Sequence, residues 1–147
     1  MAEQTQTYTS ESILLKGTAQ PLAGYPHAKR VGPFVYLSGF SSRRFDNTYA
    51  GVVENPDGTV TLDIKEQTRG VIENMKTVLI EAGGSLSNLV DVTVFLTDMD
   101  EFDGYNSVYN EYFNSITGPA RTTVQVSRLP DRGIKKLLIE IKGVAYI

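Results

Sequence analysis

The sequence contains no cysteine and only one histidine, His27. The absence of cysteine excludes disulfides, thiol nucleophiles and thiolate metal ligands. A single histidine disfavours a histidine-based metal site, and a Ser-His-Asp triad would have to use His27. Any chemistry must therefore come from arginine, glutamate, serine, tyrosine, asparagine or backbone groups.

Long apolar runs and clustered positive charge are missing as well. The longest apolar runs are far shorter than a membrane span, and residues 1–17 lack a cationic start followed by an apolar core, so we expect a cytoplasmic protein. No run of lysine and arginine exceeds two residues and the net charge is −3, which argues against nucleic acid as the main partner.

The 147 residues suffice for one domain with a real core, since 41% of them are hydrophobic and no tract is of low complexity. No linker or internal repeat divides the chain. We therefore predict a single domain over residues 1–147, in which residues 1–11 form a loose polar tail.

Helical periodicity predicts two helices. The first begins at Asp63, with Glu66 at capping-box spacing, and ends at Gly83-Gly84. Its inward positions recur at the helical period and are Thr68, Val71, Ile72, Met75, Val78, Leu79 and Ala82. The second helix follows Asp98, ends before Gly118-Pro119, and buries a stripe of Phe102, Tyr105, Tyr109, Tyr112 and Phe113.

Strands are predicted at 12–16, 34–39, 59–62, 90–97, 120–126 and 137–146. In the strand at 90–97, strict alternation places one set of residues on one face, namely Val90, Val92, Val94 and Leu96. The order β-β-β-α-β-α-β-β is typical of an α+β fold with both helices on one face of a sheet.

The last strand predicts that the other face of this sheet is covered by a second copy of the chain. The residues expected under the helices are Leu137, Ile139, Ile141 and Ala145. The residues expected on the opposite face are Leu138, Glu140, Lys142, Val144 and Tyr146. Because two helices cannot cover this second, partly apolar face, we expect a homo-oligomer.

Arg121 and Glu140 are the candidate catalytic pair. Arg121 stands at the start of one strand and Glu140 inside the next, between two isoleucines. A guanidinium can hold a substrate carboxylate and a glutamate can move a proton. The alternatives are structural: Arg121 as a surface ion-pair residue, and Glu140 paired with Lys142 or with Arg121 itself.

Several separated motifs, in order, resemble the RidA-type family of reactive-intermediate deaminases. They cover the chain from about Gly24 to Ala145. The motifs are Tyr25 followed by Val35-Tyr-Leu-Ser-Gly39, Val94-Phe-Leu-Thr-Asp-Met-Asp-Glu-Phe102 with Tyr105-Asn106, Gly118-Pro-Ala-Arg-Thr-Thr-Val-Gln-Val126, Arg128-Leu-Pro130, and Ile139-Glu-Ile-Lys-Gly-Val-Ala145.

This resemblance implies a chorismate-mutase-like α+β trimer with a mixed sheet and with sites between subunits. It also implies hydrolysis of enamines and imines without a metal or any other cofactor. By the same resemblance, Arg121 would hold the substrate carboxylate and Glu140 would position or activate water. Tyr25, Ser38 and Asn106 would line the pocket.

Two departures from the commonest family pattern resemble the 2-aminomuconate deaminase subgroup. An extra turn spans Asp131–Lys136, and a polar loop, Ser41–Thr48, follows Gly39. Within that loop Arg43 and Arg44 are either a solvated charge pair or the ligands of a second substrate carboxylate. Ser41 and Ser42 are expected to hold the loop, and His27 is expected to be a loop histidine rather than a catalyst.

The leading expectation is hydrolysis of the dicarboxylate 2-aminomuconate to 4-oxalocrotonate and ammonia. One alternative is a broad deaminase of short imines such as those derived from 2-aminoacrylate. The other is a trimer that binds small carboxylates, or acts like a chaperone, without turnover.

Overall fold

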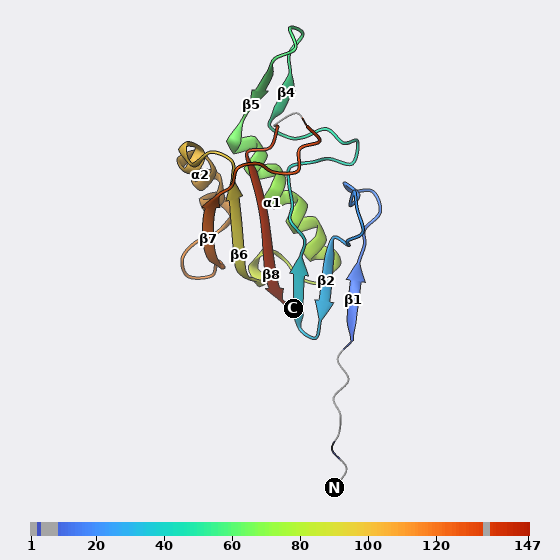
Figure 1. Ribbon diagram of the computed structural model, residues 1–147. Helices are drawn as coiled ribbons and strands as arrows, with labels where there is room; N and C mark the ends of the chain where they lie inside the picture. Colours follow the sequence, from blue (N-terminus) through green and yellow to red (C-terminus); the bar gives the residue numbers. More distant parts are fainter. Residues whose placement is uncertain (1–2, 4–8, 134–135) are drawn as a thin grey trace.

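A computed structural model describes residues 3, 9–133 and 136–147, and shows a main sheet with both long helices on the same face (Figure 1). The strands are β1 Ser10–Ile13, β2 Ala28–Val31, β3 Phe34–Leu37, β4 Val52–Glu54, β5 Val60–Leu62, β6 Leu89–Leu96, β7 Ala120–Gln125 and β8 Ile139–Tyr146. The helices are α1 Ile64–Glu81 and α2 Phe102–Tyr112, with short 3₁₀ turns at Leu86–Asn88 and Met99–Glu101.

The six-stranded sheet has the order β1-β2-β3-β8-β6-β7, and β4 and β5 form a separate hairpin that projects from the body (Figure 1). β6 and β7 are parallel and are joined through α2, while the other neighbours are antiparallel. The prediction of an α+β domain with a mixed sheet and two helices on one face is confirmed.

The sequence patterns missed β2 and β4 and misplaced the first strand. β1 begins at Ser10, where its pairing with Val31 starts, so residues 10 and 11 belong to the sheet and not to a tail. Most of the predicted tail, residues 1–2 and 4–8, lies outside the described residues. β2 and β4 have four and three residues, too few to show a period of their own.

α1 begins where expected, because the Asp63 carboxylate accepts hydrogen bonds from the backbone N–H groups of Lys65 and Glu66. The capping box is not completed: the Asp63 N–H donates to the Gly51 carbonyl oxygen, and the Glu66 carboxylate pairs with Arg69. The predicted inward residues of α1 are all buried.

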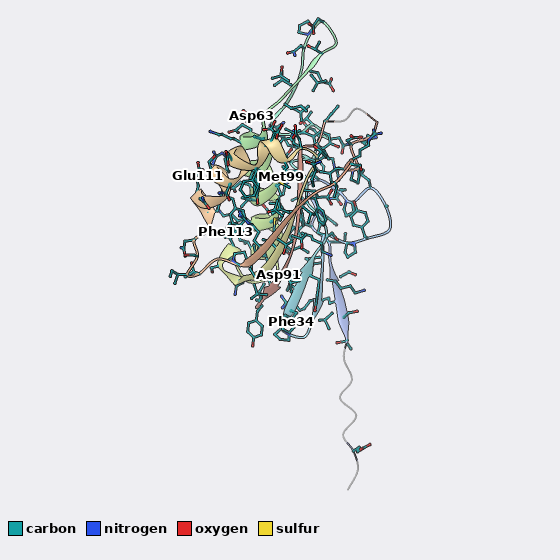
Figure 2. All side chains as sticks on the ribbon, turned by 60° about the vertical axis from the view of Figure 1, so that its left-hand side comes forward. Phe34, Asp63, Asp91, Met99, Glu111 and Phe113 are labelled. Carbon is teal, nitrogen blue, oxygen red and sulfur yellow. The ribbon has the colours of Figure 1, made fainter. Side chains whose placement is uncertain are left out.

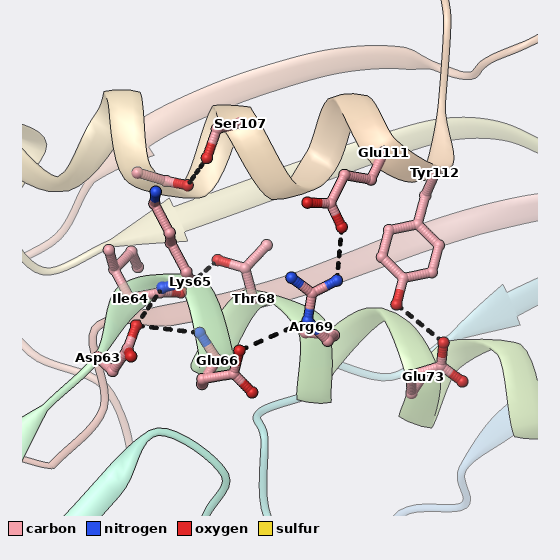
Figure 3. A network of polar contacts seen from close by, with 11 residues as sticks. Asp63, Ile64, Lys65, Glu66, Thr68, Arg69, Glu73, Ser107, Glu111 and Tyr112 are labelled. Carbon is pink, nitrogen blue, oxygen red and sulfur yellow. Dashed lines mark hydrogen bonds and ion pairs between the residues drawn. The ribbon is translucent and has the colours of Figure 1, made fainter.

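Polar contacts join the two helices along their exposed edges (Figure 3). Arg69 donates to Glu111, and the Tyr112 hydroxyl donates to Glu73 over 2.8 Å. α2 also approaches α1 closely at Gly104, since an added Cβ there would lie 2.6 Å from Cγ2 of Ile64. The helices therefore pack as one layer.

Two predicted positions were wrong: Val90 on the same face as Val92, and Leu137 under the helices. A bulge between Leu89 and Asp91 shifts the register of β6, so Leu89 is buried and Val90 is 44% exposed. Leu137 precedes the regular strand β8 and packs with Tyr49 and Leu129 in a small cluster, away from the core beneath the helices.

The rest of β8 alternates as predicted, with Ile139, Ile141 and Ala145 buried under the helices. The opposite face, which we call the open face, carries Tyr36 and Tyr146 with 49% and 56% of their surfaces exposed. Phe34, also on this face, lies at the end of the molecule away from Asp63 (Figure 2). Within the described residues, neither helix is long and apolar enough to cross a membrane.

Candidate active site

A cavity of about 380 Å³ lies where the chain leaves β3, bounded by residues 18–27, residues 38–43, α1 and Glu140 of β8. Four of the predicted site residues line it, namely Tyr25, Ser38, Arg43 and Glu140. Its other polar walls are formed by Thr18, His27, Ser41, Tyr49 and Asn74. This size suits a small-molecule ligand.

Glu140 reaches the cavity because it alternates with Ile139 and Ile141, which face the core. Burial raises the pKa of the Glu140 carboxyl above its ordinary value of 4.5. The described residues provide it with no hydrogen bond or ion pair, so the pairings considered with Lys142 and Arg121 do not form within one chain. A half-buried carboxylate with free oxygens is suited to accept and return a proton.

Gly39 leaves the space that the Glu140 carboxylate occupies. An added Cβ on Gly39 would lie 1.8 Å from Glu140 Oε1, which no side chain can occupy without displacing the carboxylate. The backbones cannot separate easily, because Phe40 and Ile141 exchange hydrogen bonds of 2.8 and 3.0 Å. A larger residue at position 39 would therefore move the Glu140 carboxylate from this position.

The loop that carries Arg43 is fixed on α1. The Asn74 amide donates to the carbonyl oxygens of Ser41 and Arg43 over 2.9 and 3.0 Å. The Ser42 hydroxyl donates to the Ala50 carbonyl oxygen, and a Cβ on Gly70 would lie 2.9 Å from Ser42 Cβ. These contacts confirm that Ser42 holds the loop.

The two loop arginines have different surroundings. Arg43 lines the cavity, and its guanidinium donates to the Asn47 side chain over 2.7 Å and to the Gln20 carbonyl oxygen. Arg44 is exposed, donates to the Thr48 hydroxyl, and is not among the residues that line the cavity. Of the predicted pair, only Arg43 is placed to meet a ligand.

Ser38 and His27 connect the cavity wall to the sheet. The Ser38 hydroxyl donates to the Pro26 carbonyl oxygen over 2.7 Å. Because the Leu15 N–H donates to His27 Nδ1 over 3.2 Å, the ring proton is on Nε2, which donates to the Ala19 carbonyl oxygen over 2.9 Å. Both ring nitrogens are engaged, which agrees with the expected structural role of His27.

Arg121 and Asn106 lie in a separate place, at the edge of the sheet beside α2. Arg121 Nη1 donates to Asn106 Oδ1 over 2.8 Å. Arg121 is opposite Val92, which is buried under the helices, whereas Glu140 is opposite Phe95, which packs in the small cluster with Leu137. Paired residues share a face, so Arg121 and Glu140 are on opposite faces of the sheet in one chain.

Sequence reasoning missed the polar side chains of α1 that position the cavity. Gln67 is fully buried, donates to the Lys136 carbonyl oxygen and accepts from the Leu138 N–H, which fixes the approach to β8. Gln67 and Asn74 are on one stripe with Val71 and Val78. Polar residues within an otherwise inward stripe were the signal that could have revealed them.

Comparison with known proteins shows which family this chain resembles. A family model described as Endoribonuclease L-PSP matches residues 16–147. A RutC family protein of Pyrococcus abyssi is 41% identical over 136 residues, which cover 92% of this chain and 96% of that protein. TdcF of Escherichia coli, named as a reactive intermediate deaminase, is 33% identical over 117 residues, covering 78% of this chain and 87% of its own.

Solved structures agree in fold. Yeast Mmf1 superposes with a TM-score of 0.78 at 33% identity, covering 94% of this chain and 98% of its own. A structure of Escherichia coli TdcF with bound serine superposes with a TM-score of 0.75 at 27% identity, covering 93% of this chain and 98% of its own.

Proposed function

The chain belongs to the RidA family, which includes the RutC and TdcF proteins, and from this premise we propose that it is a cofactor-free hydrolytic deaminase of enamines and imines. The observation that carries the proposal is the Glu140 carboxylate, which has a raised pKa and lies in the cavity without a partner among the described residues. Such a group is a general base and acid, whereas capture of a carboxylate alone would need no base.

Hydrolysis of 2-aminomuconate to 4-oxalocrotonate and ammonia is the proposed reaction. Tautomerisation moves one N–H proton of the enamine to carbon and gives the imine. Glu140 then takes a proton from the attacking water and delivers it to the imine nitrogen, which gives a carbinolamine. Glu140 next transfers the hydroxyl proton of the carbinolamine to its amino group, so that the C–N bond breaks, the C=O bond forms and ammonia leaves. Arg121 neutralises the carboxylate beside the reacting carbon and makes that carbon more electrophilic.

Arg43 supports a dicarboxylate substrate, because it places a guanidinium on the cavity wall. One carboxylate would bind Arg121 and the distal one Arg43. The family model's description also names an endoribonuclease. Among the described lining residues Arg43 is the only arginine or lysine, which does not amount to the clustered positive charge that RNA binding requires.

A trimer would bring Arg121 of one subunit close to Glu140 of another, although the two residues lie on opposite faces of the sheet within one chain. We propose that the open face of one subunit packs on the next, so that Arg121 and Asn106 of one chain reach the cavity of its neighbour. The open face supports this proposal through its exposed Tyr36, Val124 and Tyr146. Light scattering should give the mass of a trimer; a monomer at micromolar concentration would overturn this arrangement.

Mixed trimers test whether the site is shared. Glu140→Gln and Arg121→Ala subunits, each inactive alone, should regain about one quarter of the wild-type turnover when unfolded together and refolded at equal ratio. The reason is that a quarter of randomly formed interfaces join an intact Glu140 to an intact Arg121. If the mixture stays inactive although mass spectrometry shows mixed trimers, both residues act within one chain or not at all.

Substrate identity is tested by comparing Arg43→Ala with Arg44→Ala. A charge-assisted hydrogen bond contributes about 1.5–3 kcal/mol, so Arg43→Ala should lower kcat/KM for 2-aminomuconate by roughly 10- to 150-fold. Ammonia release from 2-aminoacrylate, a monocarboxylate, should change little. Arg44→Ala is the matched control and should leave both reactions near wild type, because Arg44 is outside the cavity lining.

An equal loss on both substrates in Arg43→Ala would show that Arg43 only holds the loop through its bonds to Asn47 and Gln20. The broad deaminase of short imines would then be the better description of this protein. The two substrates measured side by side on the wild-type enzyme give the same distinction directly.

A further inference from the structure

Tyr109 of α2 carries an unusual hydroxyl. Among the described residues it is the only buried side-chain polar atom without a hydrogen-bond partner. The residue is only 6% exposed, so bulk water does not replace the missing bond. A buried hydroxyl without a partner destabilises the folded chain, and such groups are rare enough in proteins to require a reason.

The group beside Tyr109 is the Arg121 guanidinium. The Arg121 Cζ atom lies 4.6 Å from the centre of the Tyr109 ring, compared with 5.3 Å for Tyr105 and 5.9 Å for Phe102. Only one acceptor, Asn106, holds this guanidinium among the described residues. A guanidinium has five N–H donors, so Arg121 has unused donors over the face of a ring whose hydroxyl has no partner.

The other tyrosine in contact with Arg121 differs on this point. The Tyr105 hydroxyl is hydrogen-bonded to the Thr123 hydroxyl. The missing hydrogen bond of the Tyr109 hydroxyl therefore does not reflect a general lack of polar partners beneath α2. Burial also raises the pKa of Tyr109 to about 12, so the phenol remains neutral at ordinary pH and its oxygen is available as an acceptor.

We propose that Tyr109 is a positioning residue for carboxylate binding, whose hydroxyl oxygen accepts a hydrogen bond from Arg121 when the guanidinium turns to bind a ligand carboxylate. Asn106 and Tyr109 then fix the guanidinium plane from two sides, as bidentate binding of a carboxylate requires. The inference rests on the role proposed above for Arg121.

This arrangement couples stability to affinity. In the free protein the hydroxyl lacks a partner, and in the loaded protein it has one, so ligand binding relieves the cost of the free state. Removing the hydroxyl should therefore weaken binding without destabilising the fold. For a tyrosine whose hydroxyl is already hydrogen-bonded in the free protein, removing the hydroxyl should instead destabilise the fold and leave ligand binding unchanged.

The test compares Tyr109→Phe with Tyr112→Phe in the assembled protein. Tyr112 is on the same helix, its hydroxyl is bonded to Glu73, and its ring is not one of the three beside Arg121. Calorimetry measures the Kd of L-serine, with L-serinamide as the probe that lacks a carboxylate, and thermal unfolding gives Tm. Arg121→Ala is measured in parallel.

Tyr109→Phe should raise the Kd of L-serine about 10-fold or more and leave Tm unchanged or higher. Tyr112→Phe should leave Kd unchanged and lower Tm slightly. An unchanged Kd in Tyr109→Phe, or a lowered Tm, would overturn the role of Tyr109 if Arg121→Ala still abolishes binding. If Arg121→Ala binds L-serine like the wild type, the role proposed for Arg121 fails instead, and that of Tyr109 with it.

Discussion

Replacing Glu140 with glutamine is expected to lower kcat by about 100-fold or more, the usual contribution of a positioned acid–base group. Glutamine keeps the size of the side chain and its contact with Gly39 but cannot carry the proton. Steady-state ammonia release measures the effect. A variant with an unchanged oligomeric state and near-wild-type kcat would show that Glu140 is structural, and would favour a cavity that binds small carboxylates without turnover.

The same variant has an expected effect on stability that follows from the raised pKa. Because folding favours the neutral carboxyl, the stability that Glu140 contributes is fully present below about pH 4.5 and is lost as pH rises through the folded pKa. At neutral pH, Glu140→Gln should therefore have a higher Tm than the wild type. The difference should shrink toward pH 4. A lower Tm at neutral pH would show that a cation of a neighbouring subunit already pairs with the free carboxylate.

Gly39→Ala is expected to reduce turnover almost as much, although it removes no functional group. The new methyl would occupy the position of Glu140 Oε1, since the two would be 1.8 Å apart, so the acid must rotate away from the substrate. Displacement of a catalytic group by about 1 Å can cost 100-fold in rate. The measurement is kcat, together with Tm to confirm that the protein is folded.

Gly24→Ala is the matched control for this experiment. Gly24 lies in the loop beside the cavity, an added Cβ there meets nothing within 4 Å, and its φ is not in the region reserved for glycine. It should therefore leave kcat near wild type. In the double variant Gly39→Ala/Glu140→Gln the two losses should not add, because both act on one carboxylate. Full additivity would mean that Gly39 contributes in a way independent of Glu140.

The sequence by itself determined the layer architecture, because periodicity and capping are local properties. Asp63 and Gly83-Gly84 mark the ends of α1, and alternation in β8 separates Ile139 and Ile141 from Glu140. The same local patterns cannot predict a β-bulge, because a bulge is defined by pairing with another strand. Alternation placed Val90 on the face of Val92, because the extra residue that displaces it is defined only by the partner strand.

The division of the candidate site was decided only by the tertiary structure. The family resemblance predicted a pocket between subunits without indicating which subunit supplies which residue, and the structure brings Tyr25, Ser38, Arg43 and Glu140 of one chain around one cavity. Arg121, together with Asn106, lies away from this cavity because strand register places Arg121 and Glu140 on opposite faces of the sheet. That register depends on which residues of β6 pair with β7 and with β8. Register is a property of paired strands, so no single stretch of sequence contains it.

Close contacts between distant residues were equally invisible in the sequence. Gly39 reads there as the end of a strand, and Tyr109 as one member of an aromatic stripe. Folding places Gly39 against a carboxylate about a hundred residues away in the chain and leaves the Tyr109 hydroxyl buried beside Arg121. Composition and spacing determine which groups are available for chemistry. Their distances, and the burial that changes their acidity, exist only once the sheet and helices have packed.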